Sequence, residues 1–208
     1  VHPGFSSKQF DYSQKQRWRE EKRAELSVSD DQCLIGLITS GSLDKRNIDL
    51  FIRSIAALNP KLRAKCKFIV SGKDSKISHY KKLAGSLGVT NLNFIGMIPD
   101  VEKIYSALDF SVLPAKWEEF GRVVVEAMGL GLPVICSNKV GASELLEGKS
   151  RELIFETNNI DQLTKCIEKL VKDQGFRQEV AEINSKTALK YTEKAQAEKL
   201  VEMLKQQN

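Results

Sequence analysis

The sequence predicts an α/β protein with a Rossmann-like, doubly wound parallel sheet of about six strands, helices on both faces of the sheet, and C-terminal helices after it. Two observations predict this fold. From residue 33 onwards, short apolar runs alternate with amphipathic segments. The runs are apolar throughout rather than alternating with polar residues, which is typical of strands that are buried on both faces of a parallel sheet.

The strands are the runs without a helical period. The first, "CLIGLIT", is apolar except for its last residue, and "KFIVSG" ends at Gly72, which favours a turn. We expect strands at residues 33–39, 67–72, 91–96, 109–114, 133–137 and 152–155.

The helices are the segments with apolar residues three and four positions apart, such as Ile48, Phe51, Ile52 and Ile55. Ser13 and Thr192 are candidate N-caps, and Gly88 is a candidate C-terminal stop. We expect helices at about residues 13–26, 46–58, 76–88, 100–108, 121–131, 141–147, 159–174, 176–190 and 193–206.

This pattern divides the chain into three regions. Residues 1–32 form a polar N-terminal linker and helix, residues 33–175 form the α/β domain, and residues 176–208 form terminal helices. The chain starts at Val1 rather than at a methionine, and we expect it to be part of a longer protein.

Composition limits the function classes. Hydrophobic residues make up 41% and charged residues 28% of the chain, which is ordinary for a soluble protein with a core. The net charge of +5 is compatible with anionic ligands or an anionic membrane surface, but it is too small and too scattered to predict a nucleic-acid partner. The four cysteines form no CxxC motif, so we expect free thiols in a reducing cytosol. No apolar run reaches the ~18 residues of a membrane span.

Ligands of doubly wound folds bind at the carboxyl ends of the strands. The stretch "KWEEFGRVVVEAM" follows the fourth predicted strand and opens a helix near Gly121. A helix start with free N–H groups suits a diphosphate, and a glycine lets the ligand approach the backbone. Glu126 would lie about one turn into this helix and point towards the same crevice, where a sugar diol would satisfy its oxygens. The alternative from the residues alone is that Glu126 pairs with a basic side chain and that Glu118 is a solvated loop residue.

An ordered series of motifs resembles the C-terminal half of retaining glycosyltransferases of family 4, which have the GT-B fold. The resemblance covers roughly residues 33–175, and lipopolysaccharide-core glucosyltransferases of bacteria are the members it is most similar to. The motifs are Glu118 and Glu126 with seven residues between them, Ala127-Met128, "GLPVI" at 131–135 and "VGASE" at 140–144.

The resemblance implies a nucleotide-diphosphate sugar as the donor, with a UDP-sugar expected, and no cofactor or metal. Glu118 would contact hydroxyls of the transferred hexose, and Glu126 would hold the ribose diol. Lys45 and Arg46 would clamp the phosphates, although the family commonly has Lys and Gly where Arg46 and Asn47 stand. The backbone that would hold the diphosphate or the sugar is that of Phe120, Gly121, Arg122 and Val123.

Other site residues follow from the same resemblance. Met97 and Ile98 would border the base, Gly72 would border the crevice, and Gly41 is one of two residues where the family sometimes has a further arginine. Ile98 is an equally good core residue, and Lys45 and Arg46 fit a solvated helix start as well. No Asp-x-Asp motif or cluster with metal-ligand spacing occurs, so we expect a metal-independent reaction.

The predicted function is transfer of a hexose to an acceptor hydroxyl with retention, in lipopolysaccharide or polysaccharide biosynthesis. The acceptor would be a sugar or a lipid-linked glycan, and the enzyme would be cytoplasmic, with peripheral association at the inner membrane face as an option. The C-terminal helices would cross to an N-terminal domain that this chain lacks. The alternatives are a nucleotide-sugar-binding module without catalysis and an unrelated nucleotide-binding domain such as a dehydrogenase; the missing G-x-G-x-x-G disfavours the latter.

Overall fold

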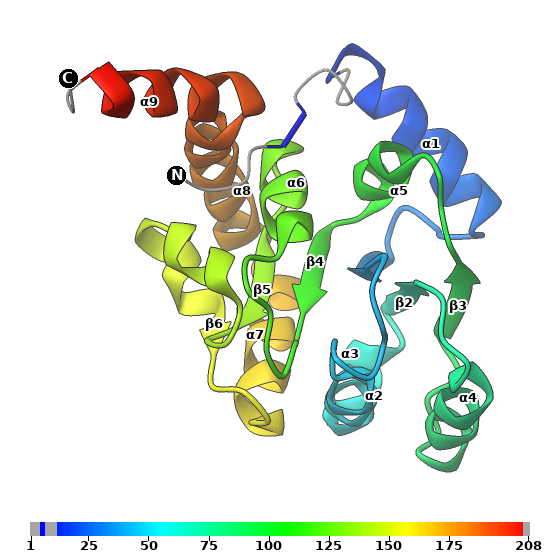
Figure 1. Ribbon diagram of the computed structural model, residues 1–208. Coiled ribbons are helices and arrows are strands. Elements are labelled where there is room, and N and C mark those ends of the chain that lie inside the picture. The colour runs from blue at the N-terminus through cyan, green and yellow to red at the C-terminus, as the bar shows by residue number, and fades with distance from the viewer. Residues whose placement is uncertain (1–4, 7–11, 206–208) are drawn as a thin grey trace.

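The computed structural model describes residues 5–6 and 12–205, and it has the predicted architecture (Figure 1). One parallel sheet has the strand order β3-β2-β1-β4-β5-β6, so the direction of winding reverses between β1 and β4. The strands are β1 (Cys33–Ile38), β2 (Cys66–Ser71), β3 (Leu92–Gly96), β4 (Phe110–Leu113), β5 (Val134–Ser137) and β6 (Ile154–Phe155). The predicted fold class is therefore confirmed.

Helices connect the strands and extend beyond the last one. The α-helices are α1 (Lys15–Glu25), α2 (Ile48–Ala57), α3 (Pro60–Arg63), α4 (Ile77–Ser86), α5 (Val101–Ala107), α6 (Arg122–Gly129), α7 (Ile160–Lys172), α8 (Gln174–Ala188) and α9 (Glu193–Lys205). Short 3₁₀ helices are η2 (Tyr12–Gln14), η3 (Gly141–Leu145), η4 (Gly148–Leu153) and η5 (Leu189–Tyr191).

Two hydrophobic cores form, one on each face of the sheet. Along β1, Ile35 and Leu37 join the core beneath α2, α4 and α7, while Leu34 and Ile38 join the core beneath α5 and α6. Both faces of the strand are apolar because both are covered, and this explains the unbroken apolar runs. Figure 1 shows α2 and α4 on one side of the sheet and α1 and α5 on the other.

Several predicted boundaries need correction. Helix α1 begins at Lys15 with Gln14 in the N-cap position, so Ser13 is not its cap. The segment predicted as a helix at 141–147 is the 3₁₀ helix η3, and the Gly141 and Ala142 N–H groups at its start donate to carbonyls of the loop before α6. Strand β6 has two residues rather than four, since η4 continues to Leu153. Residue 206, the last of the predicted terminal helix, lies outside the described residues.

Helix α3 was not predicted. Its signals are local and visible: Asn59 accepts a hydrogen bond from the Lys61 N–H at 3.0 Å, and Pro60 occupies the first turn. Two predicted helix ends are confirmed. Thr192 Oγ1 accepts from the Ala195 N–H at 3.2 Å, and Gly88 adopts a φ of 67° after α4.

Ion pairs link the N-terminal helix α1 to the α/β domain. Asp109 Oδ1 lies 2.8 Å from Arg19 Nη2, and Asp109 Oδ2 lies 3.1 Å from Arg23 Nη1. Arg23 is a buried residue, 6% exposed, and Asp109 Oδ2 also accepts the Leu34 N–H at 2.7 Å. This network joins α1 to the starts of β1 and β4.

The N-terminal end of the described chain contacts the start of α9. Phe5 forms a parallel bridge with Thr192, donates its N–H to Tyr191 O at 3.0 Å and accepts from the Glu193 N–H at 3.0 Å. A Cβ atom on Gly129 would lie 2.7 Å from the Phe5 ring, so this ring sits directly against α6. None of the described helices has the length and apolar character needed to cross a membrane.

Candidate donor-binding site

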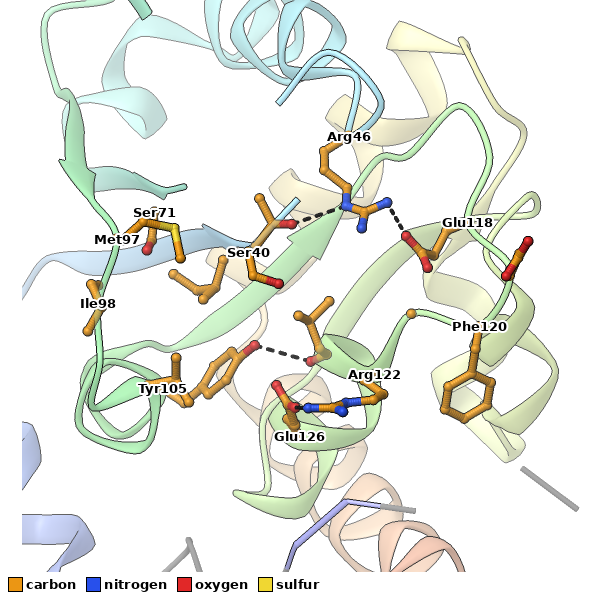
Figure 2. Close-up of a pocket in the computed structure, with 16 residues that line it drawn as sticks. Ser40, Arg46, Ser71, Met97, Ile98, Tyr105, Glu118, Phe120, Arg122 and Glu126 are labelled. Atoms are coloured by element: carbon orange, nitrogen blue, oxygen red, sulfur yellow. Dashed lines mark hydrogen bonds and ion pairs between the residues drawn. The ribbon is translucent and has the colours of Figure 1, made fainter. Parts of the chain in front are cut away.

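A cavity of about 560 Å³ lies at the carboxyl ends of the strands, where the winding direction reverses between β1 and β4. This is where doubly wound folds bind their ligands. Its walls come from the segments after β1, β2, β3 and β4 and from α5 and α6 (Figure 2). The lining residues are Ile38, Thr39, Ser40, Arg46, Ser71, Met97, Ile98, Val101, Tyr105, Glu118, Glu119, Phe120, Gly121, Arg122, Val123 and Glu126.

The start of α6 forms one wall of this cavity. Gly121 precedes the helix with a φ of 90° and a ψ of 60°, a left-handed conformation that disfavours residues with a side chain. A Cβ atom there would also lie 2.9 Å from Val140 Cγ1. No side chain caps this helix start. A helix start of this kind, with backbone N–H groups that no side chain caps and the positive end of the helix dipole, is typical of an anion site.

Glu126 lies one turn into α6 and lines the cavity, as its position in the sequence predicted. Its neighbours Val124, Val125 and Ala127 are buried in the core, which explains the apolar company of this carboxylate. Burial raises the pKa of Glu126, while Arg122, whose Nη2 lies 3.5 Å from Glu126 Oε1, opposes this rise. The side chain of Glu126 is only 14% exposed and that of Arg122 is 67% exposed.

Arg46 faces α6 from the other side of the cavity, on the segment between β1 and α2. Its Nε donates to Thr39 Oγ1 at 3.1 Å, and its Nη1 forms an ion pair with Glu118 Oε2 (Figure 2). A Cβ atom on Gly41 would lie 2.9 Å from Arg46 Nη2, so the glycine leaves room for the guanidinium. Arg46 is thus oriented by its surroundings before any ligand contacts it.

The loop that carries Glu118 is held by the segment after β5. The Glu118 N–H donates to Lys139 O at 2.9 Å, the Gly141 N–H donates to Glu118 O at 3.0 Å, and the Ala142 N–H donates to Phe120 O at 2.6 Å. A Cβ atom on Gly141 would lie 2.0 Å from the Glu119 carbonyl oxygen. This close approach explains the glycine, and it makes the "VG" motif a support for the site loop.

Most of the predicted site residues come together in this cavity. Arg46, Met97, Ile98, Glu118, Phe120, Gly121, Arg122, Val123 and Glu126 all line it. Lys45, Gly41 and Gly72 do not. The Lys45 residue is exposed, and its carbonyl accepts the Lys116 N–H at 3.1 Å; the Gly72 N–H donates to Gly96 O at 3.0 Å.

Other lining residues were not singled out from the sequence. Thr39 and Ser71 stand at or just beyond the ends of β1 and β2, which is the one signal that points to them. Tyr105 is fully buried, and its hydroxyl donates to the Val123 carbonyl at 3.4 Å. Burial, together with the nearby Glu126, raises the pKa of Tyr105 well above its ordinary value.

Metal ligands do not gather in this part of the molecule. Among residues 5–6 and 12–205, no group of three or more His, Cys, Asp or Glu side chains has an arrangement that would hold a metal ion. The four cysteines are buried free thiols. Burial raises the pKa of Cys66 and of Cys136 to about 12, so these thiols stay protonated at neutral pH.

The fold and the site together define a class: a doubly wound domain with an uncapped helix start at the switch point and a carboxylate on either side of it. Comparison with known proteins gives the family. A family model described as "Glycosyl transferases group 1" matches residues 19–187, so the chain belongs to this family.

Relatives and solved structures agree with this assignment. An uncharacterised glycosyltransferase of Methanocaldococcus jannaschii is 26% identical over 183 residues, which cover 86% of this chain and 46% of the relative. The lipopolysaccharide glucosyltransferase WaaG of Escherichia coli is 29% identical over 166 residues, covering 79% of this chain and 44% of WaaG. The chain thus spans about half the length of these relatives.

The crystal structure of WaaG superposes with a TM-score of 0.82 and 26% identity, covering 89% of this chain and 50% of that protein. The structure of Anabaena Alr3699/HepE in complex with UDP and glucose has a TM-score of 0.83 and 20% identity, covering 98% of this chain and 55% of that one. The second comparison is one of fold alone.

Proposed function

We propose that the chain is the donor-binding half of a glycosyltransferase that takes a hexose from a nucleotide diphosphate, a UDP-sugar above all, and transfers it to an acceptor hydroxyl. One observation carries the proposal: the start of α6 has Glu126 on one side and the Arg46–Glu118 pair on the other, within one cavity. A nucleoside diphosphate sugar has an anion between two sets of hydroxyls, which matches this order of groups.

The proposed roles follow from the chemistry of each group. The N–H groups at the start of α6 and the Arg46 guanidinium bind the diphosphate, and Arg46 offers the planar set of donors that phosphate oxygens accept. Glu126 accepts hydrogen bonds from the ribose hydroxyls, and Glu118 accepts them from the hexose. Met97 and Ile98 lie at the end of the cavity beyond Tyr105 and border the base.

In the proposed reaction, the bond between the anomeric carbon and the diphosphate oxygen breaks, and the electron pair leaves with the diphosphate. Arg46 and the dipole of α6 stabilise this growing negative charge without rearranging, and preorganised groups of this kind are an effective source of catalysis. The acceptor oxygen forms the new bond on the same face, so that the configuration is retained. We propose that no metal takes part.

The other half of the enzyme would supply the acceptor pocket and the group that takes the acceptor proton. The relatives are about twice as long as this chain, and Leu200, Val201, Met203 and Leu204 of α9 are 45–55% exposed. We propose that an N-terminal domain covers this face of α9. The acceptor would be a sugar or a lipid-linked glycan, and the enzyme would work in the cytoplasm, with peripheral contact to the membrane where the acceptor is lipid-linked.

A second candidate function is a nucleotide-sugar-binding module that performs no transfer by itself. The observation that favours it is the site itself, whose lining groups suit a donor and include none that is assigned to the acceptor. Both candidates predict donor binding, and they differ in turnover. Transfer of sugar to a panel of soluble and lipid-linked acceptors by this chain alone would contradict the second.

Calorimetric titration with UDP, GDP and ADP tests the proposal. We expect UDP to bind with a dissociation constant in the micromolar to millimolar range, and Glu126→Ala to weaken it by about 10-fold or more, because hydrogen bonds to a charged group are lost. Glu179→Ala, on the exposed surface of α8, is the control and should bind as the unaltered protein does. Absence of binding for all three nucleotides at millimolar concentration would overturn the donor site.

A further inference from the structure

The two arginines that line the cavity both contact a carboxylate of the same cavity. Arg46 pairs with Glu118, and Arg122 approaches Glu126. Together with Glu119, the lining carries two cationic and three anionic side chains. A diphosphate that enters this cavity therefore meets arginines that are already neutralised, and carboxylates that repel it.

The Arg46–Glu118 pair is the one that matters for an incoming phosphate. Both side chains are 18% exposed, whereas Arg122 is 67% exposed. Solvent therefore screens the attraction between Arg46 and Glu118 less than it screens the attraction between Arg122 and Glu126. Arg46 Nε donates a hydrogen bond to Thr39 Oγ1, and Arg46 Nη1 forms the ion pair with Glu118. Phosphate oxygens and Glu118 thus share the single charge of one guanidinium, and the pairing with Glu118 weakens its attraction for phosphate.

Backbone hydrogen bonds hold the loop that carries Glu118 in place, so the carboxylate cannot move away from Arg46 by a shift of the loop. The N–H and carbonyl of Glu118 are both hydrogen-bonded to the segment at residues 139–141. The ion pair can therefore break only if the side chain of Glu118 turns away from Arg46. A half-buried carboxylate without a partner is costly, so Glu118 then needs another hydrogen-bond donor in place of Arg46. Sugar hydroxyls are such donors.

We propose that Glu118 is a specificity-determining residue that makes the site favour the nucleotide sugar over the bare nucleotide diphosphate. With the sugar bound, its hydroxyls satisfy Glu118 and Arg46 is free for the diphosphate. Once the sugar has been transferred, Glu118 loses these donors, takes back Arg46 and weakens the hold on the diphosphate product. This inference rests on the proposed donor site, and it adds a role in product release.

Glu118→Gln tests this role, because the amide keeps the shape of the side chain and removes its charge. We expect the variant to bind UDP about 5-fold to 10-fold more tightly than the unaltered protein, since Arg46 no longer has a competing partner, and to bind UDP-glucose no more tightly. A role of Glu118 in structure alone would weaken both ligands together. The thermal midpoint of each variant, measured by circular dichroism, shows whether the fold is kept.

Glu119→Gln is the matched control. It removes the same charge from the same cavity wall, but Glu119 forms no ion pair with Arg46 in the described structure. We expect less than a 2-fold gain in UDP affinity for it. In an Arg46→Gln background, the gain from Glu118→Gln should disappear, because the effect acts through Arg46.

The outcomes separate the two proposals. If the unaltered protein binds no nucleotide, the proposed donor site is wrong and this inference falls with it. If the unaltered protein binds UDP but Glu118→Gln does not tighten it, or tightens it no more than Glu119→Gln does, the donor site stands and the competition between Glu118 and phosphate is refuted. The UDP measurement decides this whichever sugar the natural donor carries.

Discussion

At the scale of single residues, the two glutamates that line the cavity have different surroundings. Glu126 is held in a helix among core residues and is more deeply buried than a carboxylate ordinarily is, with one exposed arginine as its partner. Glu118 sits on a loop and has a half-buried arginine as its partner. Carboxylates whose pKa is perturbed by burial cluster at functional sites, which supports the role proposed for Glu126.

The burial of Glu126 predicts a pH-dependent stability. Its pKa is raised in the folded protein, so the folded state binds the proton more tightly than the unfolded state, and ionisation of Glu126 destabilises the fold. This loss begins as pH rises above the ordinary glutamate pKa of 4.5 and is complete above the raised pKa. Glu126→Gln has no carboxylate at this position and therefore does not show this loss of stability.

We therefore expect Glu126→Gln to match the unaltered protein near pH 4 and to be the more stable of the two at neutral pH. Urea unfolding at intervals from about pH 4 to about pH 8 measures the difference. Glu179→Gln, an exposed carboxylate, should show no comparable trend. A stability difference for Glu126→Gln that stays constant over this range would contradict the account.

At the scale of elements, the loop before α6 is in close contact with the segment after β5. The loop before α6 carries Glu118 and the backbone of the anion site, and η3 starts against it at Gly141. The "VG" motif, Val140-Gly141, contributes no residue to the cavity lining. Its hydrogen bonds nevertheless hold the loop whose residues do line the cavity.

Gly141→Ala should disrupt this fit. The new Cβ atom would lie 2.0 Å from the Glu119 carbonyl oxygen, and because that atom belongs to the backbone, the whole loop must shift. We expect a loss of stability of about 1–3 kcal/mol, as for other overpacked sites, and a loss of UDP affinity of more than 10-fold. Urea unfolding and calorimetry measure the two effects.

Gly85→Ala provides the comparison. Gly85 lies in α4, and a Cβ atom there would have nothing within 4 Å. The substitution should stabilise the protein by about 0.5–1 kcal/mol through helix propensity and leave UDP affinity unchanged. Equal behaviour of the two alanine variants would show that the contact between the loops is not tight.

At the scale of the whole molecule, segments from the two ends of the sequence complete the α/β domain. Helix α1 packs against α5 and is tied to it by arginines, and Phe5 joins the start of α9 to α6. Figure 1 shows α1 beside α5, on the far side of the sheet from α2 and α4. Helix α1 and Phe5 thus form part of the packed structure.

Asp109→Ala should loosen this attachment. It would leave Arg23, which is 6% exposed, without its carboxylate, and a buried charge that loses its partner costs about 3–5 kcal/mol. Urea unfolding measures this cost. Asp100→Ala removes an exposed partner of Lys103 and should cost less than about 1 kcal/mol. Similar losses for the two variants would contradict the role given to the buried network.

Much of the fold was predictable because its signals are local. Burial of the strands on both faces requires the apolar runs, and the glycine after α4 and the threonine before α9 mark helix ends through backbone geometry and capping. The short elements were less predictable. Helix α3 is a single turn, and η3 is a 3₁₀ helix whose first N–H groups bond to a loop more than twenty residues earlier in the chain, a contact that no local pattern indicates.

The sequence by itself determined the alternation of strands and helices, and the resemblance drawn from its motifs indicated that the segments after the strands, with Glu118 and Glu126, form a site. Only the tertiary structure decided that Arg46 enters the cavity while its neighbour Lys45 stays outside, that Arg46 contacts Glu118, and that Asp109 holds α1. The reason is the range of the forces. Periodicity and capping act within a few residues, whereas these contacts join residues 72 to 90 positions apart, and their geometry exists only once the sheet has formed.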